Sequence, residues 1–489
     1  MNHHLPRSGA HKLMLGFLFT CITMMLYCFS APTFQANTQS FPVPAPCANK
    51  SSIWQKKSSF TTSEVKHCVP KMNLMFLKTH KAASSTVLNI LLRYGEKNGL
   101  KFALPSGRND FSYPATFMRV HVKDYRPGAC FNIICNHMRF NAPEVEALLP
   151  SDTFFFTILR DPALVFESSF HYYKSVVPLT WRIHGEDKLT DFLNDPQVHF
   201  DSNGFNSFYL KNLHFFDLGF DNTVEPEDPL VDRAIRAISE RFQLIMIAEH
   251  FEESLILLKD ALCWQMDDLL FFSMNTRRPT SVSQLTPELR TKAREWNGVD
   301  WKLYRYFNAT LWAKVNAYGR KRMEKEVKKL RQRNSKMAAI CISGGMAVED
   351  QDIRDLSMRP WQPVGESSIL GYNMRNNIEQ QYRELCRKML TPEIQYLTDL
   401  GMTLPPSLMR SDFTICFPLL TSLSVFSPFY KSFTSPAYHL QDLLGCITNI
   451  YSRWSMVFTQ KSFKILTRIL PSLTSPPRSY MPLDQPNYH

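Results

Sequence analysis

One stretch of the sequence, residues 73–94, constrains the fold more than any other. It reads NLMFLKTHKAASSTVLNILLRY and opens with four apolar residues, a run short enough to be a strand buried on both faces. It closes with apolar residues at positions 87, 90, 91 and 94, which is the spacing of one helix face. Small and hydroxyl residues lie between the two. Because free N–H groups at a helix start favour anions, this strand–turn–helix pattern predicts a phosphate-binding turn.

The composition of the turn narrows the kind of phosphate site. A nucleotide triphosphatase loop needs GxxxxGK[ST], but this turn has no glycine, and Lys81 precedes the small residues. The pattern resembles the 5′-phosphosulfate loop of Golgi sulfotransferases, which bind 3′-phosphoadenosine 5′-phosphosulfate (PAPS) without an obligatory metal. The competing interpretation is an ordinary polar turn. On the first interpretation the cofactor-binding residues are Lys78, Thr79, His80, Lys81, Ala82, Ala83, Ser84, Ser85 and Thr86.

The N-terminal region predicts a membrane anchor. Residues 13–30 form an uncharged span that follows Arg7, His11 and Lys12, and its length is just adequate for a membrane-spanning helix. The basic flank on the N-terminal side predicts that the rest of the chain is translocated. A cleaved signal peptide is the alternative, since small residues follow the span. We expect a cytoplasmic tail (residues 1–12), a transmembrane signal anchor (13–32) and a lumenal stalk (33–71).

Other features agree with a lumenal location. Eleven cysteines in 489 residues suit an oxidising compartment, and sequons occur at Asn49 and Asn308. The net charge of +12 is compatible with anionic ligands or membrane surfaces. The expected catalytic domain covers residues 72–404. Residues 405–489 form an atypical C-terminal tail rich in Ser, Pro, Phe and Leu, to which the sequence assigns no role.

Three further apolar runs predict more strands of the same sheet. They cover residues 131–135, 153–159 and 242–247, and each leads into polar residues. Strand–loop–helix units in sequence indicate a parallel sheet with right-handed crossovers. The expected fold class is therefore α/β, with a central parallel sheet flanked by helices. Ligands of such sheets bind at the carboxyl ends of the strands.

Candidate site residues follow two of these strands. His137 comes directly after the second strand, and Arg160 ends the third. Ser168 lies eight residues after Arg160, two turns into the next helix, so both side chains can face one pocket. A guanidinium fork with a hydroxyl suits a terminal phosphate. In the same helix, Asp161 is expected to be the N-cap and Pro162 the first helical residue.

Several motifs in one order resemble a known enzyme family. LKTHKAASSTVLNIL, FNIICNHMRF, TILRDPALVFESSFHYY and AEHFEESLILLKDALCW are similar to the galactose 3-O-sulfotransferases. SGRNDFSYP, VVPLTW and MLTPEIQYL are similar, more narrowly, to the branch that acts on galactosylceramide. The likeness runs from about Asn73 to Leu404. The family usually has Thr where this chain has Ala82, which removes one hydroxyl near the 5′-phosphate and leaves the backbone donors in place.

The resemblance implies a P-loop-like sulfotransferase fold and a PAPS-dependent transfer to the 3-hydroxyl of a terminal galactose, giving sulfatide from galactosylceramide and also sulfating lactosylceramide. Lys81 would stabilise the charge that grows on the leaving phosphate. By family analogy, Arg160 and Ser168 would hold the 3′-phosphate. The acceptor hydroxyl needs a general base, for which His137 is preferred and His80, inside the loop, is the alternative. No metal is expected.

The resemblance also implies partners and location. The expected partners are a glycolipid with a terminal galactose and the Golgi membrane, in a single-pass type II arrangement with the catalytic domain in the lumen. No nucleic-acid partner is expected, and the oligomeric state is left open, with a homo-oligomer among the options. Two other functions stay open: a sulfotransferase acting on galactose of glycoproteins, and a tethered glycan-binding protein that has lost catalysis.

Overall fold

The computed structural model of this chain describes residues 68–363 and 368–402. The expected anchor, almost all of the expected stalk and the C-terminal tail lie outside the described residues, as does the sequon at Asn49. Among the helices of the described part, none combines the length and the apolar composition needed to cross a bilayer.

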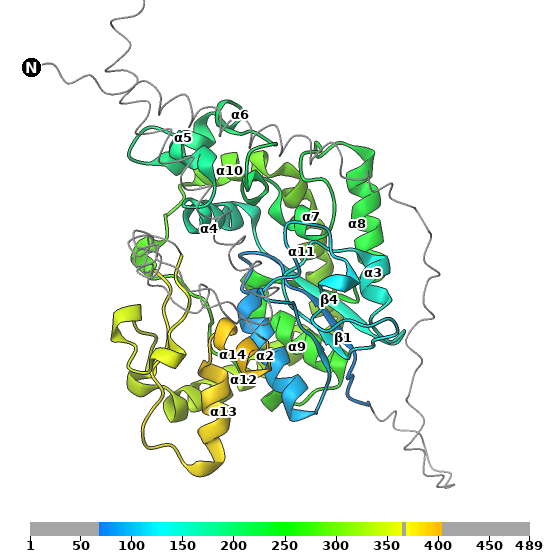
Figure 1. Cartoon of the computed structure of the whole chain (residues 1–489), viewed down its shortest axis with the longest axis vertical. Helices are drawn as coiled ribbons and strands as arrows, with labels where there is room; N and C mark the ends of the chain where they lie inside the picture. The colour runs from blue at the N-terminus through cyan, green and yellow to red at the C-terminus, as the bar shows by residue number, and fades with distance from the viewer. Residues whose placement is uncertain (1–67, 364–367, 403–489) are drawn as a thin grey trace, which may run out of the picture. The chain divides into compact units, whose positions relative to one another are not determined.

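A parallel sheet of five strands is the centre of the fold (Figure 1). Its order is β2-β3-β1-β4-β5, and β1 aligns Leu74 with Ile133 on one side and Phe154 on the other. Every residue of β1, β4 and β5 is buried, as the apolar runs predict. The strands are β1 (Leu74–Leu77), β2 (Phe102–Ala103), β3 (Ile133–Ile134), β4 (Phe154–Leu159) and β5 (Leu244–Ile247).

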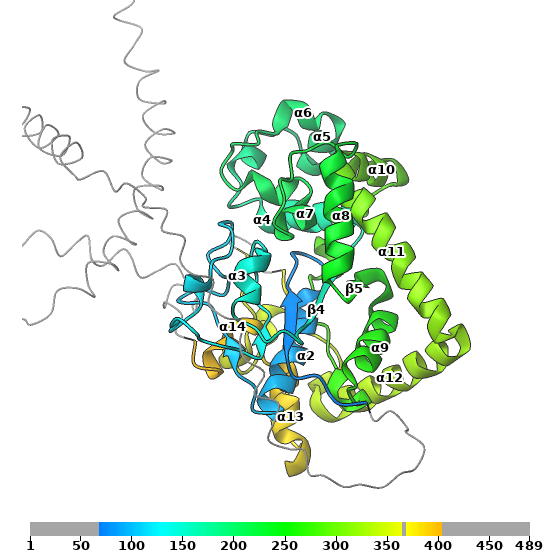
Figure 2. The ribbon, with the colours of Figure 1, turned by 90° about the vertical axis from the view of Figure 1, so that its right-hand side faces the viewer.

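The expected α/β class with helices around a parallel sheet is confirmed (Figure 2). The sequence did not predict β2, because two residues are too short to show a periodic pattern. The second expected strand, residues 131–135, is reduced to Ile133–Ile134.

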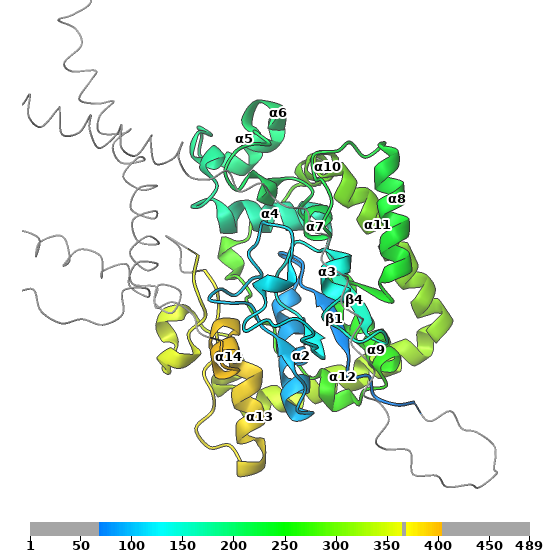
Figure 3. The same cartoon turned by 45° about the vertical axis from the view of Figure 1, so that its right-hand side comes forward.

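Helix α2 (Ser84–Lys97) follows the polar turn and is buried on nearly all sides. Its predicted face at Val87, Ile90 and Leu91 packs into the core, but Leu88 and Leu92 are buried too. The reason is tertiary: α13 (Gln380–Leu390) and α14 (Glu393–Asp399) cover its other side (Figure 3). Full burial of an aliphatic side chain contributes roughly 1.5–3 kcal/mol, so this cover adds substantially to the core.

Helix α4 (Pro162–Tyr173) begins as the sequence predicts. The Asp161 carboxylate accepts a hydrogen bond from the backbone N–H of Ala163 at 3.0 Å, and Pro162 is the first helical residue. Two further helices form a second buried cluster with α4, at one end of the described part of the chain (Figure 1). They are α5 (Lys188–Asn194) and α10 (Pro287–Trp296).

Helices α11 (Gly298–Tyr318) and α12 (Arg320–Cys341) meet at an angle beside α9 (Phe251–Leu262), as Figure 2 shows. Gly319 joins the first two with a φ of 93°, a conformation that L side chains rarely adopt. Disulfides link Cys68 to Cys263 and Cys341 to Cys386. The remaining α-helices are α3 (Ala142–Glu146), α6 (Pro196–His199), α7 (Leu213–Asp217) and α8 (Pro229–Arg241).

Candidate active site

The turn between β1 and α2 is tightly curled. Lys81 and Ala83 have φ values of 58° and 61°, in the left-handed region that phosphate-binding loops usually fill with glycine. Two hydrogen bonds hold this conformation: the Ser84 hydroxyl donates to the Thr79 carbonyl at 2.6 Å, and the Thr79 hydroxyl donates to the carbonyl of Ile158 in β4. The chain thus forms the tight turn without a glycine.

This turn forms one wall of a cavity of about 880 Å³ at the carboxyl ends of the strands. The side chains that converge there come from segments far apart in the chain. Of the residues expected to bind the cofactor or act in catalysis, those that line the cavity are Lys78, His80, Lys81, Ala82, Ala83, Ser84, Ser85, Thr86, His137, Arg160 and Ser168. Thr79 does not line it, because its side chain is fully buried against the sheet.

Five cationic side chains line this cavity, and Arg277 and Arg331 are among them. Three of them, Lys78, Lys81 and Arg160, belong to the expected site. Burial lowers the pKa of Lys81 well below its ordinary value, and the charges of Arg277, Lys78 and Arg160 lower it further. The Lys81 ammonium also lies 2.7 Å from the ring centroid of Tyr172. An anion placed here would relieve the mutual repulsion, so the cluster favours a ligand with several negative charges.

Arg277 is a residue that sequence reasoning missed. It lies in the segment between Leu270 and α10 and donates a hydrogen bond to the Ser281 carbonyl at 3.0 Å. Its guanidinium also pairs with Glu167, a buried carboxylate of α4. Glu167 therefore holds the Arg277 guanidinium next to α4, the helix that also carries Ser168. No pattern near residue 277 indicated this role, because the contact joins segments 110 residues apart.

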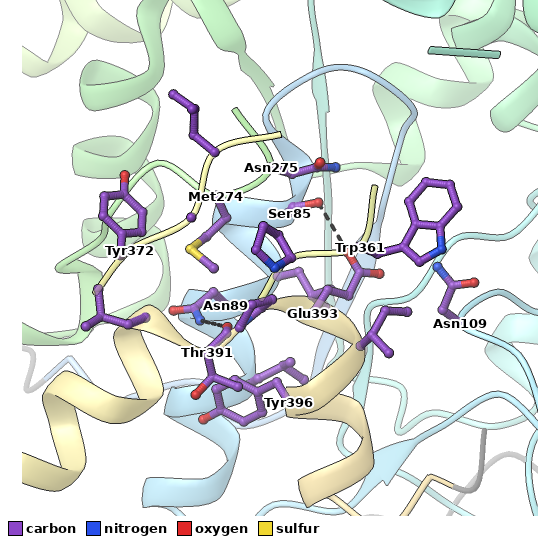
Figure 4. A pocket seen from close by; sticks show the side chains of 18 of the residues that line it. Ser85, Asn89, Asn109, Met274, Asn275, Trp361, Tyr372, Thr391, Glu393 and Tyr396 are labelled. Carbon is purple, nitrogen blue, oxygen red and sulfur yellow. Dashed lines mark hydrogen bonds between the residues drawn. The ribbon is translucent and has the colours of Figure 1, made fainter. Parts of the chain in front are cut away.

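Glu393 is the second missed residue, and it brings a negative charge among the cations. Its carboxylate accepts hydrogen bonds from the Lys78 ammonium at 2.8 and 3.0 Å and from the Ser85 hydroxyl at 3.2 Å. Figure 4 shows this carboxylate facing Ser85 in a smaller adjoining pocket of about 90 Å³. Glu393 belongs to the MLTPEIQYL motif, whose role the sequence left unassigned. It fixes Lys78 at the edge of the turn.

The two candidate bases lie against one another. The rings of His80 and His137 are stacked, with centroids 3.9 Å apart and planes inclined by 9°. The Nδ1 atom of His137 is 2.7 Å from the Lys78 carbonyl oxygen, so Nδ1 carries the proton and Nε2 keeps its lone pair. Burial lowers the pKa of His137 well below 6.5, and the neighbouring His80 and Lys78 lower it further. His137 is therefore held as a neutral imidazole that can accept a proton.

His80 has a different partner. Its Nδ1 lies 2.8 Å from a carboxylate oxygen of Asp217, which is fully buried and also accepts the Tyr113 hydroxyl at 2.8 Å. The same carboxylate accepts the backbone N–H of His80 at 2.8 Å. His80 is thus anchored at both its backbone and its ring. The structure brings both histidines to the cavity and gives each an Nδ1 partner.

Aromatic side chains form another wall of the cavity. Tyr173 and Tyr209 stack with centroids 3.7 Å apart, and Tyr113 lies 6.0 Å from Tyr209. Tyr113 comes from the segment between β2 and β3, as do Asn109 and Asp110, which also line the cavity. Flat aromatic faces beside amides and carboxylates suit a sugar ring, which has both apolar and hydroxyl surfaces.

Asn308, the second sequon, lies outside the cavity in the middle of α11. The side chain is partly buried, and its carbonyl oxygen is buried with no hydrogen-bond partner among the described residues. In the part of the chain that the structure describes, no group of three or more His, Cys, Asp or Glu side chains could hold a metal ion.

Comparison with known proteins decides the family. A sequence model described as galactose-3-O-sulfotransferase matches residues 3–404. The chain belongs to this family. The family match starts well before Asn73, where the motif likeness begins, so it also includes the N-terminal region. It ends at residue 404, as the motifs indicate.

This chain aligns with most of the length of several curated proteins of the galactose-3-O-sulfotransferase family. Human galactosylceramide sulfotransferase is 52% identical over 81% of this chain and 94% of its own, and the mouse protein of that name is 50% identical over the same shares. Galactose-3-O-sulfotransferase 2 of the pig is 44% identical over 67% of this chain and 83% of its own. The resemblance inferred from the motifs is confirmed.

Proposed function

We propose that this protein is a galactosylceramide 3′-sulfotransferase, which transfers the sulfuryl group of PAPS to the 3-hydroxyl of the galactose of galactosylceramide. One observation carries this proposal: the cation cluster, the paired histidines and the aromatic wall meet in one cavity. The 52% identity to a relative named for galactosylceramide supports the choice of acceptor over a glycoprotein glycan.

The residues of the cavity fit PAPS as the sulfuryl donor. The turn at residues 78–86 would hold the 5′-phosphosulfate through its backbone N–H groups and Lys81. Arg160 and Ser168, which both line the cavity, would grip the 3′-phosphate, and Arg277 adds another cation there. Arg160 also donates to the Lys81 carbonyl at 3.0 Å, which ties the two phosphate-binding elements together.

In the proposed reaction, His137 accepts the proton of the galactose 3-hydroxyl through Nε2 while that oxygen attacks sulfur. The bond between sulfur and the bridging phosphate oxygen breaks, and Lys81 stabilises the negative charge left on that oxygen. Glu393 keeps Lys78 in place beside the turn. The buried cavity walls limit competing attack by water.

The function is tested with the full-length protein, radiolabelled PAPS and galactosylceramide in vesicles. We expect label to be transferred to the lipid, with lactosylceramide as a second acceptor. Mucin-type oligosaccharides should be poorer acceptors. A clear preference for those oligosaccharides would assign the enzyme to glycoproteins, and no transfer to any galactose acceptor would leave the glycan-binding alternative.

Arg160→Ala tests the donor site. Because charge-assisted hydrogen bonds contribute about 1.5–3 kcal/mol, the apparent constant for PAPS should rise about tenfold or more, with the acceptor constant nearly unchanged. Arg233→Ala, which removes an exposed arginine of α8 that is not among the cavity-lining residues, is the matched control. An unchanged PAPS constant in a folded Arg160→Ala protein would remove Arg160 from the donor site.

For location, we propose a type II protein of the Golgi membrane with its catalytic domain in the lumen. The uncharged span at residues 13–30 and its basic flank support this orientation. Protease added to sealed Golgi vesicles should leave the catalytic domain intact. Digestion of that domain without detergent would contradict the proposal.

A further inference from the structure

Three large apolar side chains are exposed between α4 and α7. Val176, Trp181 and Phe205 are 37%, 45% and 72% exposed. Their sequence neighbours Val177, Leu179 and Leu210 are buried in the cluster that also contains α5 and α10. The loops that carry the exposed side chains are therefore packed onto a buried cluster, so these side chains are exposed in the folded protein.

Hydrogen bonds join the two loops that carry these side chains. The Asn206 side-chain amide donates to the Val176 carbonyl at 2.8 Å, and the Trp181 indole N–H donates to the Lys174 carbonyl at 2.6 Å. Asn206 has a φ of 60°, which turns the chain sharply after Phe205. With its polar N–H satisfied, the indole of Trp181 presents its apolar ring to the outside.

The same loops continue directly into the aromatic wall of the active site. Tyr173, three residues before Val176, lines the cavity, and so does Tyr209, four residues after Phe205. The two tyrosine rings stack on each other at 3.7 Å. The exposed apolar side chains therefore lie next to the wall that we assign to the sugar.

Charged residues of both signs lie around these side chains. Lys174 and Arg182 are exposed beside them, and the exposed acids of the same segment are Glu186, Asp187, Asp195 and Asp201. Asp187 accepts the backbone N–H of Thr190 at 3.2 Å, and Asp201 accepts that of Asn203 at 2.9 Å. Exposed Trp and Phe beside charges of both signs suit the interface of a zwitterionic bilayer, where aromatic rings lie at the level of the headgroups.

We propose that Val176, Trp181 and Phe205 form a membrane-docking surface, which inserts into the boundary between headgroups and acyl chains of the bilayer that holds the acceptor. The inference rests on the proposed function, because a galactose headgroup on ceramide is presented at that boundary. Docking there would place the aromatic wall of the active site at the same level above the bilayer as the galactose headgroup. It would raise the effective concentration of the acceptor without adding a contact to the reacting atoms.

The test compares two acceptors on one full-length protein reconstituted in phosphatidylcholine vesicles. One acceptor is galactosylceramide in the same vesicles, and the other is a water-soluble β-galactoside without a lipid chain. The double variant Trp181→Ala, Phe205→Ser should lower kcat/KM about tenfold for galactosylceramide and change it less than twofold for the soluble galactoside. Met346→Ser, at a side chain that is 69% exposed in another part of the fold, is the control and should change neither value.

Equal losses with both acceptors would overturn the proposal, because they would show that these residues support the cavity itself. No loss with galactosylceramide would also overturn it. Phe205→Ser alone keeps the test valid if Trp181 is needed for folding, since the Phe205 side chain makes little packing contact. The wild-type activity on galactosylceramide tests the proposed function separately, and the ratio of variant to wild type tests the docking surface.

Discussion

His137→Ala is expected to lower turnover on galactosylceramide by about 10² to 10⁴, the usual contribution of a positioned general base. PAPS should still bind, because the imidazole acts on the acceptor proton. Its Nδ1 is held by the Lys78 carbonyl, which leaves Nε2 to accept that proton. Turnover at saturating acceptor and nucleotide affinity by calorimetry measure the two effects separately.

The pH profile gives an independent check. Because the pKa of His137 is well below 6.5, the imidazole stays neutral as the pH falls through that value. The acid limb of the wild-type rate should therefore lie below pH 6.5, where the neutral base is finally lost by protonation. The limb should disappear in the residual activity of His137→Ala.

His80→Ala is the matched variant, since its ring stacks on His137 and is anchored by Asp217. We expect it to weaken PAPS binding more than it slows the transfer step, because it removes the ring contact with Asp217 that holds the phosphate-binding turn. If His137→Ala keeps near-normal turnover, and His80→Ala loses it with PAPS still bound, the base is His80.

Lys81→Ala is expected to lower turnover by about 10² to 10³, the effect of losing one preorganised donor to a developing charge. The charge on the leaving oxygen grows only as the S–O bond breaks, so the loss should appear in kcat more than in the apparent constant for PAPS. The lowered pKa of Lys81 reflects burial and three neighbouring cations, and the donor phosphates should raise it again.

Lys101→Ala is the control for Lys81→Ala. Its ammonium also lies over an aromatic ring, 4.6 Å from the centroid of Phe131, but Lys101 is exposed and is not among the cavity-lining residues. It should leave turnover unchanged. If Lys81→Ala weakens PAPS binding but leaves kcat unchanged, Lys81 contributes to PAPS binding in the ground state and not to stabilisation of the transition state.

Strands β1, β4 and β5 and the turn could be predicted from the sequence because their signals are local. A four-residue apolar run, a turn of small and hydroxyl residues and an apolar helix face lie within 22 consecutive residues at 73–94. The capping of α4 by Asp161 is equally local. Parallel strands place their carboxyl ends at one edge, which is why Lys81, His137 and Arg160 meet in one cavity as expected.

Tertiary structure alone decided the partners of these residues. The contacts of Glu393 with Lys78, Arg277 with Glu167 and Asp217 with His80 span 315, 110 and 137 residues. No local pattern encodes such pairs, because they depend on how helices pack around the sheet. The same holds for α2, whose second buried side is set by α13 and α14. The sequence by itself determined the fold class, the turn and the candidates Lys81, His137 and Arg160. Packing added Arg277 and Glu393 to the cavity and decided which charges neutralise, orient or repel one another.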